Sequence, residues 1–165
     1  YGITVHNESN ELNTLLEILV NNIDEEDEII ICDDYSDRKT KDVIEHWDLH
    51  SSDTKSIKTY QRKLDGNFSD QKNSVIEQSS GDYIFHIDAD EYPHDTLLAQ
   101  ARVFRNREDI RWTRPLHEYI TGCDTYSHLP PHEALSLYHP KTIQRQEEQN
   151  LFYNSNFSRE LNTRS

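Results

Sequence analysis

Residues 83–91, Tyr-Ile-Phe-His-Ile-Asp-Ala-Asp-Glu, decide the fold of this chain. Apolar and β-favouring residues run from Tyr83 to Ile87, with turn signals on both sides. The pattern predicts a short buried strand with Asp88 and Asp90 at its carboxyl end, where open α/β sheets bind their ligands. Two carboxylates so close together repel each other unless a cation lies between them. The stretch alone therefore fits a metal site and an acidic surface turn equally well.

The chain before this stretch alternates between strand-like and helix-like segments. Strand composition is found at residues 1–5, 28–32 and 56–60. Apolar residues recur at helical spacing over residues 12–23, a second helix is expected over residues 40–47, and a third over residues 71–78. Ser69 or Asp70 is expected to cap the last of these helices. This order predicts an α/β fold with a mostly parallel central sheet and helices on both of its faces.

A second acidic turn, Asp33-Asp34, follows the strand predicted at residues 28–32. Because the strands of a parallel sheet end at one edge, we expect this turn to converge with Asp88 and Asp90. The sequence has no Gly-x-Gly-x-x-Gly and no Walker motif. That absence argues against a dinucleotide-dependent dehydrogenase and against a P-loop enzyme.

The composition favours one polar but globular domain. The 165 residues are 33% hydrophobic and 29% charged, which suits a single domain with a core. The net charge of −14 argues against a free nucleic-acid backbone as a partner, and fits either recruitment of divalent cations or plain solubility. The only cysteines are Cys32 and Cys123, so we expect a reducing, cytoplasmic setting. No apolar run approaches the ~20 residues of a membrane span.

Four short motifs occur in a fixed order, each at a predicted strand end or helix start. They are Asn7-Glu8, Asp33-Asp34-Tyr35-Ser36-Asp37, Lys72-Asn73 and Asp88-Ala89-Asp90. Each motif is weak alone, but together they make the first two-thirds of the chain resemble the family 2 glycosyltransferases, which have a GT-A fold. In style the sequence is similar to small glycosyltransferases of bacteria and their phages.

The resemblance implies transfer of a sugar from a nucleotide-diphosphate donor, with a UDP-sugar as the expected donor and Mn²⁺ or Mg²⁺ as the cofactor. Asp34 would contact the base or the ribose, and Asp88 the ribose or the diphosphate. Asp90 would hold the cation, which stabilises the negative charge of the diphosphate leaving group. The implied donor-binding residues are Val5, Asn7, Glu8, Asp34, Ser36, Lys72, Asp88 and Ala89.

The second half of the chain resembles a subset of the family. In an inverting transfer a carboxylate removes the proton of the acceptor hydroxyl, and Glu118 of the pair His117-Glu118 is the candidate for this base. A plain surface carboxylate is the alternative for Glu118. His139 is a candidate second metal ligand because neutral imidazole suits Mn²⁺, although a structural histidine fits as well. No role is assigned to His117.

The connection after the Asp-x-Asp strand is shorter than the acceptor-binding segment that family members usually carry. We therefore expect residues to be missing from the sequence near 98–101. Residues 1–98 would form the nucleotide-sugar-binding half of a single GT-A domain, and residues 99–165 the acceptor and catalytic half with a C-terminal helix. The acceptor stays open among polysaccharide, lipid-linked sugar, protein and modified nucleobase.

Two other functional classes stay open. A nucleotidyltransferase shares the α/β layout and the acidic metal site, but residues 5–9 lack the glycine-rich basic loop of that class. A non-catalytic binding protein on a degenerate transferase scaffold agrees with the short connection near residue 98. A metal-dependent hydrolase is disfavoured because the nine histidines show no ligand spacing.

Overall fold

The computed structural model describes residues 1–50, 56–93, 103–116, 118–123, 125 and 137–138. Its main elements are β1 (Gly2–Val5), α1 (Ser9–Asn22), β2 (Glu28–Asp33), α2 (Arg38–His50), β3 (Ser56–Gln61), α3 (Phe68–Gln78) and β4 (Tyr83–Asp88). Five short strands follow in the described residues, β5 (Tyr92–Pro93), β6 (Val103–Arg105), β7 (Arg111–Thr113), β8 (Tyr119–Thr121) and β9 (Leu137–Tyr138). The predicted alternation of strands and helices is confirmed through β4.

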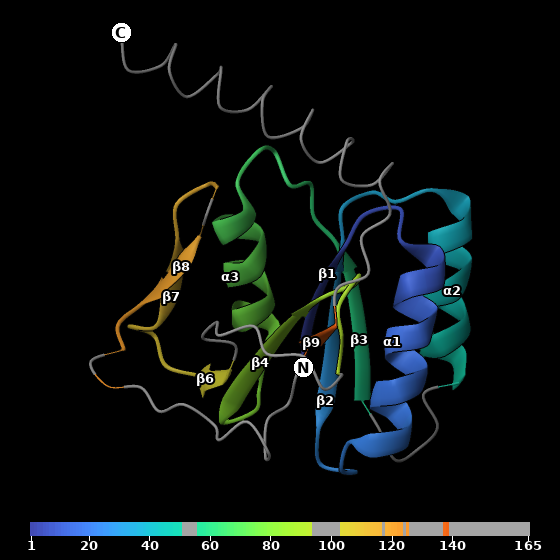
Figure 1. Cartoon of the computed structure of the whole chain (residues 1–165), viewed down its shortest axis with the longest axis horizontal. Coiled ribbons are helices and arrows are strands. Elements are labelled where there is room, and N and C mark those ends of the chain that lie inside the picture. The colour runs from blue at the N-terminus through green and yellow to red at the C-terminus, as the bar shows by residue number, and fades with distance from the viewer. Residues whose placement is uncertain (51–55, 94–102, 117, 124, 126–136, 139–165) are drawn as a thin grey trace, which may run out of the picture.

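The central sheet has the strand order β3-β2-β1-β4-β6 (Figure 1). Strands β1 to β4 run parallel, and β6 pairs with β4 in the antiparallel direction. Thr4 pairs with Asp88, and Val5 with Asp33, so the strand ends lie level with one another. We call the end of the sheet formed by the carboxyl ends of β1, β2 and β4 the carboxyl edge.

Strand β2 is buried on both of its faces, which is why its sequence is almost continuously apolar. Side chains alternate along a strand, so neighbouring residues enter different cores. Ile29 and Ile31 pack with residues of α1 such as Leu12. Ile30 and Cys32 pack on the other face with Val75 of α3. Helices α1 and α2 thus cover one face of the sheet and α3 the other, as predicted (Figure 1).

Helix α3 lies close against β1. A Cβ atom on Gly2 would stand only 2.5 Å from Val75 Cγ1, so a side chain at this position would require Val75 or the helix to shift. The predicted cap of α3 is wrong: Asn67 caps the helix, with its side-chain oxygen accepting the Asp70 amide proton at 3.2 Å. Ser69 is inside the helix instead, where its hydroxyl donates to the carbonyl of Arg114.

A hairpin of β7 and β8 is held against α3 by an asparagine. The side chain of Asn73 donates to the carbonyl of Trp112 at 2.9 Å and accepts from its amide at 2.8 Å. Trp112 then packs with Ile76 and Phe104 in a second core cluster. This bidentate pairing fixes β7, and through it β8, relative to the helix.

Several predictions fall on residues outside the described ones. These are the missing residues near 98–101, the role of His139 and the C-terminal helix. The division of the domain into halves at residues 98 and 99 also stays a prediction. Among the described helices, none has the length and apolar character needed to cross a bilayer.

Glu28, at the start of β2, gives a pH-dependent prediction. Burial opposes its ionisation, but hydrogen bonds from Lys58 at 2.7 Å and from the amides of Ser80 and Gly81 lower its pKa to about 2. The folded pKa lies below the unfolded value, so this stabilisation is complete above about pH 4.5 and is lost as the pH falls toward 2.

We therefore expect Glu28→Gln to lower the free energy of unfolding at pH 7 by about 1–3 kcal/mol. Urea denaturation at a series of pH values should show the wild-type and variant stabilities converging below about pH 4. The exposed Glu77 provides a matched control, since Glu77→Gln should have almost no effect at any pH. A difference at Glu28 that is independent of pH would contradict the assignment.

Candidate active site

The loops that leave β1 and β2 are tied together at the carboxyl edge. Asn7 has a φ of 60°, a left-handed conformation that asparagine tolerates better than most residues. Its amide donates to Ser36 Oγ at 3.1 Å, and its side-chain oxygen accepts the Asp37 amide proton at 2.6 Å. Ser36 is buried, and its own amide donates to Asp33 Oδ1 at 2.9 Å. These bonds hold the two predicted donor-binding loops in one arrangement.

Asp34 lies beside His6 in the same region. Its Oδ1 accepts the amide proton of Leu64 at 2.8 Å, and its Oδ2 is 3.5 Å from His6 Nδ1. His6 Nδ1 is also 2.8 Å from the Asp34 carbonyl, and His6 Nε2 is 3.1 Å from the side-chain nitrogen of Asn7. Both contacts are satisfied if His6 carries its proton on Nδ1. The Asp34 carboxylate is thereby oriented by groups from two other segments of the chain, the loop after β1 and the loop after β3.

The remaining predicted residues of these loops contribute mainly through the backbone or from buried positions. Val5 is buried, and its carbonyl accepts the Asp34 amide proton at 2.9 Å. Glu8 is buried just before α1 and accepts the amide proton of His6 at 3.2 Å. Asp37 lies immediately before α2, and hydrogen bonds from the amide and hydroxyl of Thr40 lower its pKa.

A second group of charged residues lies where β4, α3 and β8 meet. Lys72 of α3 is buried, and its Nζ lies 2.6 Å from Glu118 Oε1 and 3.6 Å from Asp88 Oδ1. Asp88 Oδ1 also accepts from the Thr4 hydroxyl at 3.4 Å and lies 4.0 Å from His86 Nε2. The structure therefore brings Glu118, predicted from a distant part of the sequence, next to the Asp-x-Asp strand.

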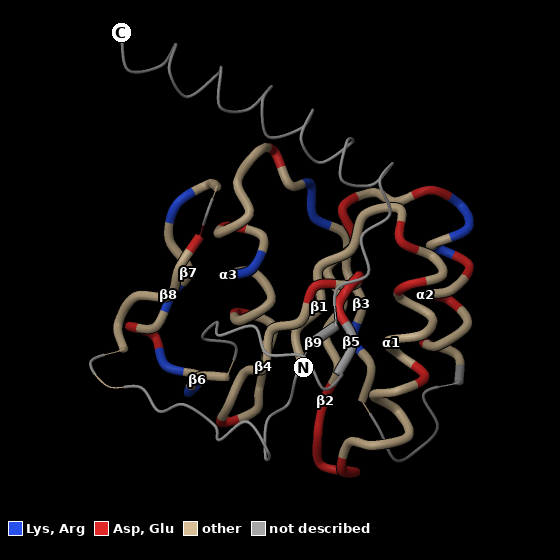
Figure 2. The backbone as a smooth tube through the Cα atoms, viewed as in Figure 1, with Lys and Arg blue, Asp and Glu red and all other residues tan. Residues whose placement is uncertain are grey.

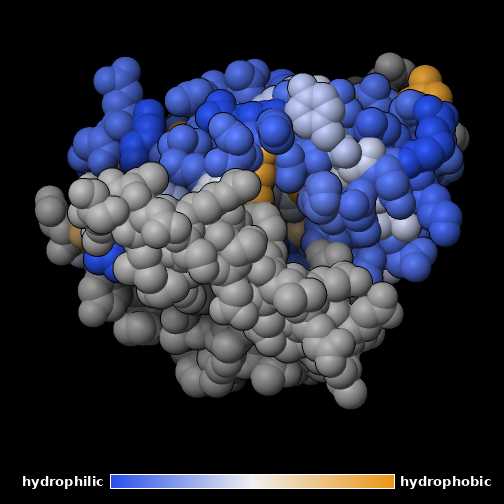
Figure 3. All heavy atoms as spheres, turned by 90° about the horizontal axis from the view of Figure 1, so that it is seen from above, coloured by the Kyte–Doolittle hydropathy of each residue, from blue (hydrophilic) through white to orange (hydrophobic). Residues whose placement is uncertain are grey.

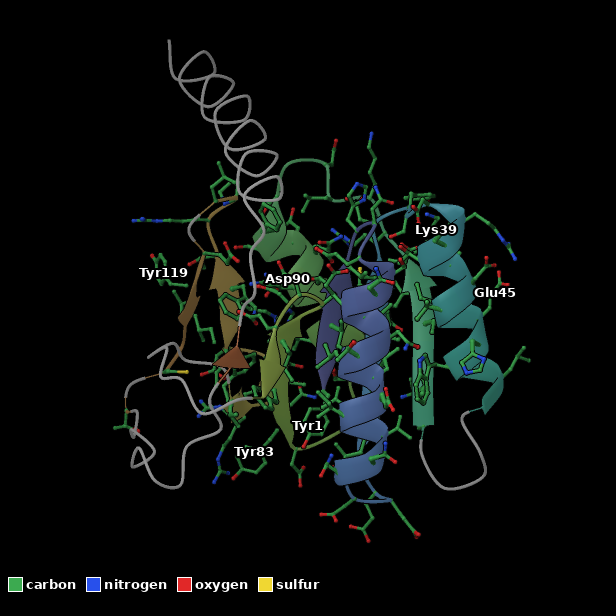
Figure 4. The ribbon with its side chains drawn as sticks, turned by 45° about the vertical axis from the view of Figure 1, so that its right-hand side comes forward. Tyr1, Lys39, Glu45, Tyr83, Asp90 and Tyr119 are labelled. Atoms are coloured by element: carbon green, nitrogen blue, oxygen red, sulfur yellow. The ribbon has the colours of Figure 1, made fainter. Side chains whose placement is uncertain are left out.

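A tight turn follows Asp88 and sets the position of Asp90. The Glu91 amide donates to the Asp88 carbonyl at 2.9 Å, and the Glu91 carboxylate accepts the Asp88 amide proton at 3.0 Å. Ala89 is buried, with its amide 3.3 Å from the carbonyl of Thr4. Asp90 is buried in this turn, close to the carboxyl edge and far from the sheet end that carries Tyr83 (Figure 4). The motif is thus built into a folded turn rather than into an open surface loop.

The residues of this turn suit a hard divalent cation. Carboxylate oxygens such as those of Asp88 and Asp90 are the ligands that Mg²⁺ and Mn²⁺ prefer. Within the described residues, no three side chains of the His, Cys, Asp or Glu type are grouped as a complete metal site. A cation in a phosphate-transfer or glycosyl-transfer site needs only one or two protein carboxylates, because substrate phosphates complete its shell. The two carboxylates therefore fit a metal that binds together with a diphosphate.

In Figure 2, acidic residues lie at both ends of the central strands, near the carboxyl edge and at the start of β2, and a basic residue lies on α3. The face seen in Figure 3 looks onto the carboxyl edge, and its described residues are mostly hydrophilic. Polar, charged surroundings of this kind suit a phosphorylated ligand better than an apolar one.

Sequence reasoning missed several residues of the site. Thr4, His6, His86 and Glu91 all contact or brace predicted residues, yet none was assigned a role. One signal was available: His86 precedes Asp88 by two positions in a strand, so both side chains are on the same face. His117 and His139 lie outside the described residues. Of the candidate residues predicted in the second half of the chain, the structure therefore locates Glu118.

Comparison with known proteins identifies the relatives of this chain. The family model described as glycosyl transferase family 2 matches residues 2–158. A comparison with curated protein sequences gives no match.

Two solved structures with a similar backbone are S. aureus TarS 1-349 in complex with UDP-GlcNAc and the mannosyltransferase PcManGT from Pyrobaculum calidifontis in complex with GDP-Man and Mn²⁺. The TarS match has 21% identity and a TM-score of 0.49, and covers 56% of this chain and 26% of that one. The mannosyltransferase match has 15% identity and a TM-score of 0.49, and covers 55% of this chain and 27% of that one. The matched region thus spans about a quarter of the length of either protein.

Proposed function

The chain belongs to glycosyl transferase family 2, and we propose that it transfers a sugar from a nucleotide-diphosphate donor to an acceptor hydroxyl, with inversion and with a divalent cation. Its α/β architecture with a mostly parallel central sheet is that of the GT-A fold predicted from the sequence. The single observation that carries the proposal is the meeting of Asp88, Lys72 and Glu118 at the carboxyl edge. Glu118, a candidate base just before β8, thereby stands beside the Asp-x-Asp strand.

The donor nucleotide is assigned to the network formed by the loops after β1 and β2. Asn7 and Ser36 hold these loops together, and Asp34 offers a fixed carboxylate that is still partly exposed. A carboxylate with a fixed orientation suits hydrogen bonds from a base or from ribose hydroxyls. Val5, Glu8 and Ala89 are proposed to shape this site from buried positions. The proposed donor is a UDP-sugar.

The diphosphate is assigned to the end of β4. Asp88 faces the ribose or the diphosphate in this proposal, and Asp90 holds Mn²⁺ or Mg²⁺, with His139 as a further candidate ligand. When bound, the cation supplies a positive charge that stabilises the leaving diphosphate. The Glu91 carboxylate keeps the turn closed, since it accepts the Asp88 amide proton.

Glu118 is proposed as the general base. It removes the proton of the acceptor hydroxyl while the acceptor oxygen forms a bond to the anomeric carbon. The bond between that carbon and the β-phosphate oxygen breaks at the same time, and the nucleoside diphosphate leaves with the electron pair. Attack from the face opposite the leaving group inverts the anomeric configuration. The side chain of Glu118 is only 18% exposed, which limits competition from water for this carboxylate.

The first test is binding of nucleoside diphosphates to the wild-type chain, followed by thermal unfolding. We expect UDP at about 100 times its dissociation constant, together with MnCl₂, to raise the Tm by roughly 5–10 °C. UDP in EDTA should give a much smaller rise. The same measurement with GDP and MnCl₂ tests whether the chain prefers uracil or guanine as the nucleobase of its donor.

Turnover of UDP- and GDP-sugars then separates the functional classes. Release of UDP or GDP in the presence of Mn²⁺ is the expected result. Release of pyrophosphate from a nucleoside triphosphate and a sugar phosphate would favour a nucleotidyltransferase instead. No response to any nucleotide in either assay would favour a non-catalytic binding protein.

A further inference from the structure

Lys72 is a buried ammonium group between two carboxylates. The residue is 4% exposed. Its Nζ lies 2.6 Å from Glu118 Oε1, 3.6 Å from Asp88 Oδ1 and 4.5 Å from the centroid of the Trp112 ring. The contact with Glu118 is the shorter of the two ion pairs. The side chains of Lys72 and Glu118 are both largely protected from water. Such a charge-assisted hydrogen bond at low exposure fixes both side chains.

Glu118, Asp88 and Trp112, which all contact Lys72, come from separate parts of the fold. Asp88 ends β4 in the central sheet, whereas Trp112 and Glu118 lie in and beside the β7–β8 hairpin, a separate two-stranded sheet. The neighbouring residue, Asn73, holds β7 through its two bonds to the backbone of Trp112. Lys72 and Asn73 together therefore connect the end of β4 to the hairpin that carries Glu118.

From this geometry we propose that Lys72 is the positioning residue of the transfer reaction, holding Glu118 beside the end of β4 where the donor's reacting carbon must lie. The inference rests on the proposed function of Glu118 as the base. It is an alternative to the predicted phosphate contact of Lys72, and it is favoured by the 2.6 Å bond between the ammonium and Glu118. Lys72 acts through Glu118, and the donor is bound by other residues.

Steady-state kinetics of Lys72→Met provides the test, since methionine keeps most of the length of the side chain and removes its charge. We expect kcat to fall by about 10- to 100-fold, as for a misplaced catalytic group, and the donor KM to change by less than about threefold. Lys72→Arg should restore most of the lost kcat because it can also pair with Glu118. Lys58→Met is the matched control: it removes the ion pair with Glu28 at the start of β2, at the end of the sheet opposite the carboxyl edge, and should leave kcat of the folded variant unchanged.

The double variant Lys72→Met/Glu118→Gln distinguishes positioning from a direct contact with the donor. If Lys72 acts only through Glu118, this double variant and Glu118→Gln should have the same kcat within about threefold. The comparison holds even if Lys72→Met alone does not fold, because the double variant removes both charges of the buried pair. A further 10-fold loss in the double variant, or a Lys72→Met variant with a raised donor KM and an unchanged kcat, overturns the inference.

Failure of the proposed function has a different signature. In that case the wild-type chain turns over no nucleotide sugar, although the Tm losses of Lys72→Met and Glu118→Gln are still non-additive because the two side chains are paired. That outcome overturns the positioning role as well, and reduces the pair to a structural contact.

Discussion

Replacing Glu118 with glutamine is expected to lower kcat for sugar transfer by about 10²- to 10⁴-fold, the usual loss when a general base is removed. Glutamine keeps the size of the side chain but cannot accept the acceptor's proton. Binding of UDP with Mn²⁺ should be unchanged within about threefold, because Glu118 is not among the proposed donor contacts. Transfer assays with the sugar donor of the wild-type chain, and UDP titrations in parallel, measure the two quantities.

The matched control for Glu118 is Glu108. It lies on the exposed surface between β6 and β7, and Glu108→Gln should keep wild-type transfer. Glu118→Gln also leaves Lys72 without its closest carboxylate, so circular dichroism should verify that the variant is folded. A folded Glu118→Gln variant with normal kcat would remove Glu118 from the mechanism.

Asp90→Asn is expected to abolish the metal-dependent part of donor binding. Removing even an outer partner of a metal site typically costs 10- to 100-fold in affinity or activity, so loss of a direct ligand should lower kcat/KM by at least about 10²-fold. The rise in Tm caused by UDP with MnCl₂ should fall to the value measured in EDTA. This second readout does not depend on finding the acceptor.

Asp82 offers a control at the other end of β4. It is exposed just before β4, at the end of the sheet opposite Asp90, and Asp82→Asn should retain the full response to Mn²⁺. If Asp90→Asn responds to UDP and MnCl₂ like the wild type, the cation is held elsewhere and the assignment of Asp90 is wrong.

The fold of the first 88 residues could be predicted because its pattern is local. The run at 28–32 is a strand buried on both faces, and the run at 83–87 is a strand with one buried face and a partly exposed one. The apolar spacing of α1 is that of a helix with one buried face. Convergence at the carboxyl edge followed from parallel pairing alone. The family predicted from the four motifs is confirmed by the match over residues 2–158.

What could not be predicted depends on tertiary contacts. The ion pair between Lys72 and Glu118 joins residues 46 positions apart, and it depends on tertiary contacts, such as those of Asn73, that hold the hairpin on α3. The cap of α3 was assigned wrongly because local propensity does not distinguish Asn67 from Ser69, and the bond of Ser69 to Arg114 settles the choice. The roles of the individual site residues stay predictions, which the variants above test.

The strand order has a consequence that involves no particular side chain. From β1 the chain proceeds outward through β2 to β3, and then crosses back to add β4 on the opposite flank of β1. The boundary between β1 and β4 is thus a topological switch point, and such points are where open α/β sheets receive ligands. The helix that follows β1 covers one face of the sheet, and the helix that precedes β4 covers the other. The connectivity therefore determines where the nucleotide should lie, and the side chains determine which nucleotide sugar is accepted there.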